Sequence, residues 1–294
     1  MVFGIAIKLK KQLKKTGHNP PIFAGKTLIM IFEKPSLRTH ASFEIGMTQL
    51  GGSALYFGPE HIGLGKRELV EHAAKVLSGM GDMIMARVFK HDTVVELAKH
   101  ASVPVINGLS NLEHPCQILA DMMTIFEYKG KFKGLKLAYV GDCENNVTHS
   151  LALASSLLGI HFVAAGPKGY TMKPEIVAKT KELAKLSGGS VTEVHDPKEA
   201  VEGADVVYTD TWVSMGDEGE KKKRLKIFPP YQVNNKLMKL AKSDAIFMHD
   251  MPAYLGNEVT KEVFDSKQSV VYSQAHNRLH AQKGLMVYLM RRPA

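Results

Sequence analysis

One short segment of the chain concentrates groups that bind anions. A predicted strand, Leu28–Phe32, runs into Glu33–His40 (EKPSLRTH), after which an amphipathic pattern begins. Ser36 is suited to cap that helix, so its unpaired N–H groups and positive dipole end would face outward beside the side chains of Arg38 and Thr39. The segment therefore predicts a phosphate or carboxylate site, with a capped surface helix bearing a salt-bridged arginine as the alternative.

Two more strand ends carry groups of the same kind. Arg87 closes the apolar run Met83–Val88, where a charge is costly unless it has a partner. His114–Gln117 (HPCQ) opens a helix after a strand and a loop, although His114 alone could equally be structural. Ligands of open α/β sheets bind outside the carboxyl ends of the strands. Three such ends together predict one anion site.

The second half offers carboxylates and amides instead. Tyr139–Asp142 ends a strand and Glu144–Asn146 opens the next helix without the GxGxxG pattern, which disfavours a dinucleotide enzyme. Asp210–Gly216 (DTWVSMG) and His249–Pro252 (HDMP) follow two further strands. The two halves together suit a cleft that holds an anion on one wall and an amine on the other.

Alternating strands and helices must position these residues. Apolar runs of strand length predict strands at Lys26–Phe32, Ala54–Phe57, Asp82–Val88, Val103–Ile106, Leu135–Val140, His161–Ala165, Val191–Val194, Asp205–Thr209 and Ala245–Met248. Helical periodicity marks Ala41–Leu50, Arg67–Ser78, Thr93–Lys99, Gln117–Tyr128 and Ala275–Leu289. The pattern predicts an α/β protein of two doubly wound parallel-sheet domains, with the active site in the cleft between them. A Lys/Gly-rich break divides 1–130, to which the C-terminal helix 275–294 returns, from 131–274.

The amino-acid composition excludes several classes of protein. The 294 residues are 45% hydrophobic and 23% charged, which is ordinary globular composition. No apolar run approaches the roughly 18–20 residues that span a bilayer. Cys116 and Cys143 can form neither a disulfide framework nor a CxxC metal site, and they fit a reducing compartment.

The net charge of +9 points to anionic partners. Lys8–Lys15 has the spacing of an amphipathic helix with a solvated face, the alternative being a targeting segment. Lys221–Arg224 follows acidic residues and is interpreted as part of a long polar loop, Gly216–Pro230, that could serve as a lid. Neither run has the interleaved aromatic residues that stack on bases, so we expect a small anionic substrate and not nucleic acid.

These motifs resemble those of the aspartate/ornithine carbamoyltransferase family. Ser36–Thr39 is similar to its Ser-Thr-Arg-Thr signature and His114–Gln117 to its His-Pro-x-Gln motif. Asp210–Gly216 resembles the segment that marks the ornithine branch, and Asn277-Arg278 resembles a pair near the C-terminus. The resemblance covers essentially the whole chain in order.

The resemblance implies a reaction and a set of roles. Carbamoyl phosphate would be bound by Ser36, Leu37, Arg38, Thr39, Arg87, His114, Gln117 and Arg278. Ornithine would be bound by Leu109, Asn146, Asp210, Ser214, Met215, Asp250 and Met251. The δ-amine would attack the carbamoyl carbon to give citrulline, as in arginine biosynthesis, with Arg87, His114, Asp210, Asp250 and Arg278 in catalytic roles. The family further implies a cytoplasmic homotrimer (or one in the mitochondrial matrix or plastid after removal of a transit peptide) and requires neither metal nor cofactor.

Four positions depart from the family pattern. Leu37 replaces a threonine, His40 replaces a second arginine, and His276 replaces a glutamate. Asp250 stands where the ornithine branch has a cysteine facing the reacting centre. There it could hold the amine protonated or act as its base. These departures leave two other hypotheses: a carbamoyltransferase with another amine acceptor, and a non-catalytic paralogue with a binding role.

Overall fold

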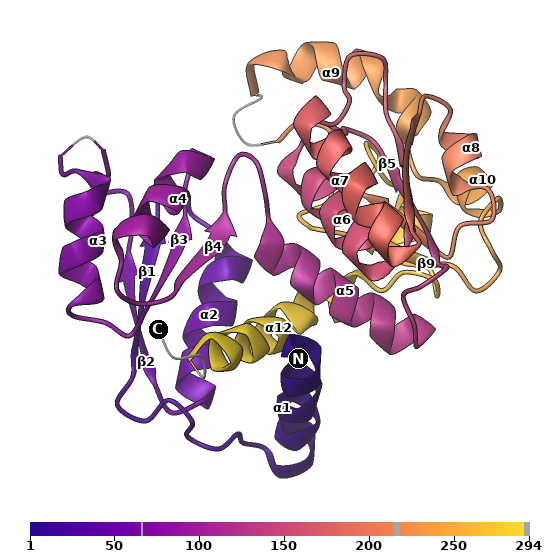
Figure 1. Cartoon of the computed structure of the whole chain (residues 1–294). Coiled ribbons are helices and arrows are strands. Elements are labelled where there is room, and N and C mark those ends of the chain that lie inside the picture. Colours follow the sequence, from indigo (N-terminus) through magenta and orange to yellow (C-terminus); the bar gives the residue numbers. More distant parts are fainter. Residues whose placement is uncertain (66, 215–217, 291–294) are drawn as a thin grey trace. The chain divides into compact units, whose positions relative to one another are not determined.

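The chain forms two compact units, each built around one parallel sheet (Figure 1). The computed structural model describes residues 1–65, 67–214 and 218–290. The first unit comprises Met1–Met123 and His276–Ala294, and the second comprises Thr124–Ala275. No helix within the described ranges is long and apolar enough to cross a membrane.

The first unit has a four-stranded sheet in the order β2-β1-β3-β4. Its strands are β1 (Thr27–Phe32), β2 (Ser53–Phe57), β3 (Met83–Arg87) and β4 (Val105–Leu109). Its helices are α1 (Val2–Thr16), α2 (Leu37–Gln49), α3 (Val70–Ser78), α4 (His91–His100), the start of α5 (Pro115–Lys129) and most of α12 (Val271–Met290). The predicted amphipathic helix at Lys8–Lys15 is therefore confirmed within α1.

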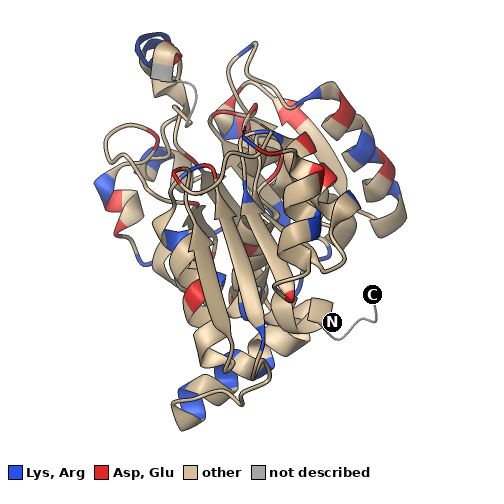
Figure 2. Ribbon diagram, turned by 90° about the vertical axis from the view of Figure 1, so that its left-hand side faces the viewer, with Lys and Arg blue, Asp and Glu red and all other residues tan. Residues whose placement is uncertain are grey.

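Alternation along the strands gives this sheet two apolar faces. Leu28, Met30 and Phe32 of β1 join a core with α1, α2 and α12, whereas Ile29 and Ile31 join a core with α3 and α4. A strand buried on both faces needs a continuous apolar run, which is the pattern in the sequence. Figure 2 shows the strands in the foreground almost wholly uncharged, with Lys, Arg, Asp and Glu on helices and loops.

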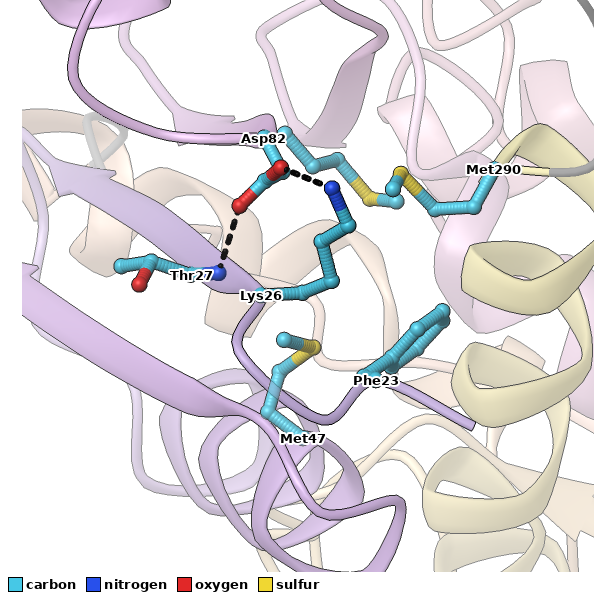
Figure 3. Close-up of a pocket in the computed structure, with 7 residues that line it drawn as sticks. Phe23, Lys26, Thr27, Met47, Asp82 and Met290 are labelled. Atoms are coloured by element: carbon cyan, nitrogen blue, oxygen red, sulfur yellow. Dashed lines mark hydrogen bonds and ion pairs between the residues drawn. The ribbon is translucent and has the colours of Figure 1, made fainter. Parts of the chain in front are cut away.

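The amino edge of this sheet is closed by an ion pair. Lys26 Nζ lies 2.7 Å from Asp82 Oδ1, and Asp82 Oδ2 accepts a hydrogen bond from the Thr27 amide at 2.9 Å (Figure 3). The cavity beside it, lined by Met47 and Met290 among others, has a volume of about 10 Å³. That is room for about one water molecule. A substrate must therefore be sought elsewhere in this unit.

The second unit has a five-stranded sheet in the order β7-β6-β5-β8-β9. Its strands are β5 (Lys136–Val140), β6 (His161–Ala165), β7 (Ser190–Val194), β8 (Val206–Thr209) and β9 (Ile246–His249). Its main helices are α6 (Asn146–Leu158), α7 (Pro174–Ser187), α8 (Pro197–Val201), α9 (Lys221–Ile227), α10 (Asn235–Met238) and α11 (Lys261–Phe264). The doubly wound parallel architecture predicted from the sequence is confirmed in both units.

Helix α12 contains the predicted helix Ala275–Leu289, and from His276 onward it belongs to the first unit. It packs closely on α1, because a Cβ atom at Gly284 would lie 2.7 Å from the Cβ of Ala6. The Lys10 ammonium of α1 donates to the Asn277 Oδ1 at 2.7 Å. These contacts hold the residue next to Asn277, Arg278, in its place along the helix.

The prediction of a long polar loop at Gly216–Pro230 is wrong for its described part. That part forms a 3₁₀ turn (Glu218–Glu220), helix α9 and a second 3₁₀ turn (Pro229–Tyr231). Arg224, which the sequence placed in this polar loop, is buried on Asp142, and Phe228 is fully buried beside Trp212 and Tyr170. An ion pair between residues far apart in the sequence leaves no local pattern. The run of lysines therefore gave no indication that Arg224 is buried.

The contact boundary between the units falls inside α5, between Met123 and Thr124. The composition placed it at the Lys/Gly-rich break near residue 130, which lies just after the end of this helix. The second division between the units falls between Ala275 and His276, inside α12. A helix shared by two units gives no compositional signal at the crossing itself.

Candidate active site

The segment that the sequence predicts to bind an anion has the expected helix cap. Ser36 has extended backbone, and its side chain accepts a hydrogen bond from the Thr39 amide at 3.3 Å at the start of α2. The carbonyl of Arg87 accepts from the Glu33 amide at 2.9 Å, which fixes the loop before the cap to the end of β3. The first turn of α2 therefore opens at the carboxyl edge of the first sheet.

Two buried arginines converge on the Thr39 hydroxyl. Arg278 Nη2 donates to Thr39 Oγ1 at 3.0 Å, and Arg87 Nη1 lies 3.4 Å from the same oxygen. Thr39 is fully buried, and Arg87 and Arg278 are 5% and 2% exposed. Elements far apart in the sequence, β3 and α12, thus deliver two guanidinium groups to the first turn of α2.

Gln117 and Asp121 complete this network from α5. Arg278 Nη1 donates to Gln117 Oε1, and Gln117 Nε2 donates to Asp121 Oδ1 at 2.9 Å. Both residues are buried. Since Asp121 accepts from the amide nitrogen, the amide oxygen of Gln117 must turn toward Arg278.

His114 stands at the start of α5 in the field of these cations. Its carbonyl accepts from the amides of Gln117 and Ile118, which begins the helix. Burial, followed by the charges of Arg278, Arg87 and Arg38, lowers the pKa of His114 well below its usual range. The imidazole is therefore neutral at physiological pH and can donate one N–H without adding charge.

The remaining predicted residues of this unit lie at or near the same sheet edge. Arg38 is partly exposed, and Leu37 is 81% exposed at the tip of α2. Leu109 ends β4, which runs three residues further than the sequence predicted. His40 pairs with Glu44 at 2.8 Å and stacks on Tyr56 with ring centroids 4.5 Å apart, so this substitution has local partners of its own.

In the second unit the two predicted aspartates are neighbours. Thr209 of β8 and His249 of β9 are register partners, so the next residues, Asp210 and Asp250, lie side by side at the carboxyl ends of adjacent parallel strands. Burial, followed by the charge of Asp250, raises the pKa of Asp210 well above its usual range. A buried carboxylate in a negative field binds a cation or a proton, and an ammonium group meets that need.

Two asparagines after β5 have different roles. Asn145 caps α6, accepting from the Thr148 amide at 2.8 Å and donating to the Tyr139 hydroxyl at 2.8 Å. Asn146 follows it at the start of the helix and is partly exposed, as a ligand-binding side chain must be. The cap thus holds the predicted ligand residue in place.

For the other predicted residues of this unit, the structure shows exposure and backbone conformation. Ser214 and Met251 are partly exposed, and Met251 has a backbone φ of 62°. Met215 lies outside the described residues. Within the described ranges, no three His, Cys, Asp or Glu side chains are grouped so that they could hold a metal ion.

Comparison with known proteins identifies the family. Residues 1–127 match the carbamoyl-P binding domain of aspartate/ornithine carbamoyltransferases, and residues 133–289 match the Asp/Orn binding domain of the same family. The chain belongs to the aspartate/ornithine carbamoyltransferase family. A relative from Thermococcus kodakarensis named "Ornithine carbamoyltransferase" is 53% identical over 283 residues, covering 96% of this chain and 90% of the relative.

Solved structures of the family are similarly close. The ornithine carbamoyltransferase from Pyrococcus furiosus superposes with a TM-score of 0.95 at 50% identity, covering 100% of this chain and 93% of that one. The anabolic ornithine carbamoyltransferase from Campylobacter jejuni gives a TM-score of 0.91 at 40% identity, covering 98% of this chain and 94% of that one.

Within this carbamoyltransferase fold, three buried residues that orient or bind other polar side chains were not predicted from the sequence. Asp121 orients Gln117, Arg224 binds Asp142, and Glu258 binds His249. Asp121 follows Gln117 by one helical turn in an otherwise apolar stretch, a signal that was present in the sequence. Arg224 and Glu258 bind residues of distant or irregular segments, and no spacing rule reveals such pairs.

Proposed function

We propose that this chain is an ornithine carbamoyltransferase, which transfers the carbamoyl group of carbamoyl phosphate to the δ-amine of L-ornithine. The observation that carries the proposal is the convergence of Arg87 and Arg278 on Thr39 at the first turn of α2. Guanidinium groups, a capped helix N-terminus and a neutral histidine suit a phosphorylated donor with a carbonyl group. Identity of about 50% to relatives named ornithine carbamoyltransferase supports the choice of acceptor.

The first unit supplies the donor half of the proposed reaction. The phosphate sits against the N–H groups of α2 with the side chains of Ser36 and Arg38. Thr39, Arg87 and His114 donate to the carbamoyl oxygen, where negative charge develops as the tetrahedral intermediate forms. Leu37, Gln117 and Arg278 complete the binding set, and neutral His114 adds a hydrogen bond without repelling the neighbouring arginines.

The second unit supplies the acceptor half. Asp210 and Asp250 attract the amino groups of ornithine, and Asn146, Ser214, Met215 and Met251 contact the rest of the amino acid, with Leu109 added from the first unit. The δ-amine attacks in its neutral form, so one proton leaves the ammonium before the C–N bond forms. The bond from the carbamoyl carbon to the phosphate oxygen then breaks, and a second proton leaves the nitrogen as citrulline and inorganic phosphate form.

Citrulline formation from carbamoyl phosphate and ornithine tests the proposal. We expect turnover by the wild-type chain and loss of most of it in Arg38→Ala, with phosphate affinity reduced about ten-fold or more in calorimetry. Lys75→Ala is the matched control, because it removes one positive charge from the same unit at an exposed side chain that pairs with the partly exposed Glu71 on α3. Unchanged phosphate affinity in Arg38→Ala would refute the donor site.

We also propose a homotrimer in the cytoplasm, as the family resemblance implies. Cys116 and Cys143 are both buried and form no disulfide, which suits a reducing compartment. Sedimentation equilibrium on the purified chain tests the assembly. A mass three times that of the chain is expected, and a monomer at micromolar concentration would contradict it.

A further inference from the structure

The turn after β9 is held by a buried histidine. His249 ends the strand with its side chain fully buried, and its Nδ1 accepts a hydrogen bond from the Met251 amide at 2.8 Å. A backbone amide can only donate, so Nδ1 carries no proton. The proton of the neutral ring must then lie on Nε2.

Glu258 faces that second nitrogen. Its Oε1 lies 3.1 Å from His249 Nε2 and also accepts from the Tyr254 amide at 2.6 Å. The Glu258 side chain is 1% exposed, and its backbone carbonyl accepts from the Val233 amide at 2.8 Å. Glu258 is therefore held through one carboxylate oxygen and through its backbone, and that oxygen stabilises the tautomer in which Nε2 is the donor.

The hydrogen bond from the Met251 amide to His249 fixes the backbone conformation on both sides of Asp250. Met251 has a φ of 62°, in the left-handed region that a side chain with a Cβ rarely occupies. The amide of this residue is the one that His249 binds. Asp250 lies between the two bonded residues, and the register of β8 and β9 sets it beside Asp210.

We propose that His249 and Glu258 are positioning residues, which lock the imidazole as its Nε2–H tautomer so that Nδ1 holds the Met251 amide and fixes Asp250 beside Asp210. Its catalytic consequence rests on the proposed function, in which these two aspartates receive the amine. If the turn changes conformation, Asp250 moves away from Asp210, and the δ-amine is no longer aligned with the carbamoyl carbon that it attacks. A misplacement of about 1 Å can cost on the order of a hundred-fold in rate.

Matched substitutions separate the two hydrogen bonds of the ring. In His249→Asn the side-chain oxygen replaces Nδ1 as acceptor, whereas in His249→Gln the longer amide reaches Glu258 and leaves the Met251 amide without its partner. Glu258→Gln keeps an acceptor for Nε2–H, and Glu258→Leu removes it. We expect His249→Asn and Glu258→Gln to retain kcat within about three-fold, and the other two to lose about ten-fold or more.

Phosphate affinity serves as the internal control, because its site is built from residues of the first unit. Calorimetric stoichiometry of phosphate counts chains with a folded first unit, and the fluorescence of Trp212 reports folding of the second unit, so kcat refers to folded chains alone. A merely structural role would lower stability in all four variants while leaving the kcat of folded protein unchanged. That pattern would overturn the positioning role.

The tautomer has a readout that does not depend on turnover. Ring ¹⁵N shifts of His249, assigned by comparison with His249→Asn, are expected to show a protonated Nε2 and an unprotonated Nδ1. A proton on Nδ1, or an imidazolium, would refute the lock. If the wild type forms no citrulline, the proposed function fails, while these spectra still test the tautomer. A crystal structure of His249→Gln then tests whether Asp250 leaves Asp210, and an unmoved Asp250 would refute its positioning.

Discussion

Replacing Arg224 with methionine tests the buried ion pair that ties α9 to the end of β5. Arg224 Nη1 lies 2.7 Å from Asp142 Oδ2 and donates to the Trp212 carbonyl at 3.1 Å. The two side chains are 4% and 1% exposed. Methionine retains most of the volume, so the substitution removes the charge and the hydrogen bonds with little loss of packing.

The magnitude follows from the geometry and from the titration of Asp142. At 2.7 Å and an effective dielectric of 20 the attraction is about 6 kcal/mol before desolvation. Burial raises the pKa of Asp142 from 3.8 to about 6 even though Arg224 lowers it. Removing one partner of a buried pair costs about 3–5 kcal/mol, because the other charge stays buried and uncompensated.

The stability that Arg224→Met loses must depend on pH. A carboxyl group whose pKa is raised on folding contributes stability that is full below about pH 4 and is lost as pH rises through about 6. Without Arg224 the pKa of Asp142 rises further. We therefore expect Arg224→Met to cost about 3–5 kcal/mol at pH 8, but only about 1–2 kcal/mol near pH 5, where Asp142 is mostly protonated.

Urea unfolding followed by tryptophan fluorescence measures this directly. Trp212 is the sole tryptophan of the chain, and its carbonyl is bound to Arg224. Lys223→Met is the control, because Lys223 is exposed and pairs with Glu220 at 3.4 Å on the surface. Equal destabilisation by Arg224→Met at pH 5 and pH 8 would refute the reasoning, since the cost would then not come from an ionised Asp142.

Three further outcomes are expected in the first unit. Asp121→Leu should weaken phosphate binding about ten-fold in calorimetry, because Gln117 loses the acceptor that orients it, whereas Asp121→Asn should keep most of the affinity. Lys283, whose pKa burial lowers to about 8, should titrate near that value by ¹³Cε NMR, and its contribution to stability should fall as pH drops through 8. Gly284→Ala should destabilise by about 1–3 kcal/mol through contact with α1, while Gly4→Ala, with open space around it, should stabilise slightly, both measured by thermal unfolding.

The fold could be predicted because its elements are locally encoded. Runs such as Leu28–Phe32 are buried on both faces of a sheet and leave a continuous apolar signal, and Ser36 caps α2 as its residue type indicates. The positions of Thr39 and Arg87 in the proposed anion site could be predicted for the same reason, since both lie at the ends of recognisable elements.

Long-range polar pairs could not be predicted. Arg224 lies in a run of lysines that resembles a solvated surface, and only the approach of Asp142 from a distant strand end makes it a buried residue. Likewise, nothing in the spacing of His249 and Glu258 indicates that one fixes the tautomer of the other. The contact boundary inside α5 is hidden because the helix continues through it.

The most direct test of the proposed function is a competition among acceptors for labelled donor. Carbamoyl phosphate carrying ¹³C at the carbamoyl carbon is mixed with the wild-type chain and equal concentrations of L-ornithine, L-aspartate and putrescine, and the products are followed by ¹³C NMR. We expect the enzyme-dependent label to enter the ureido carbon of citrulline almost exclusively. Label in carbamoyl-aspartate or carbamoyl-putrescine, or no transfer beyond that seen without protein, would contradict the assignment of ornithine as the acceptor.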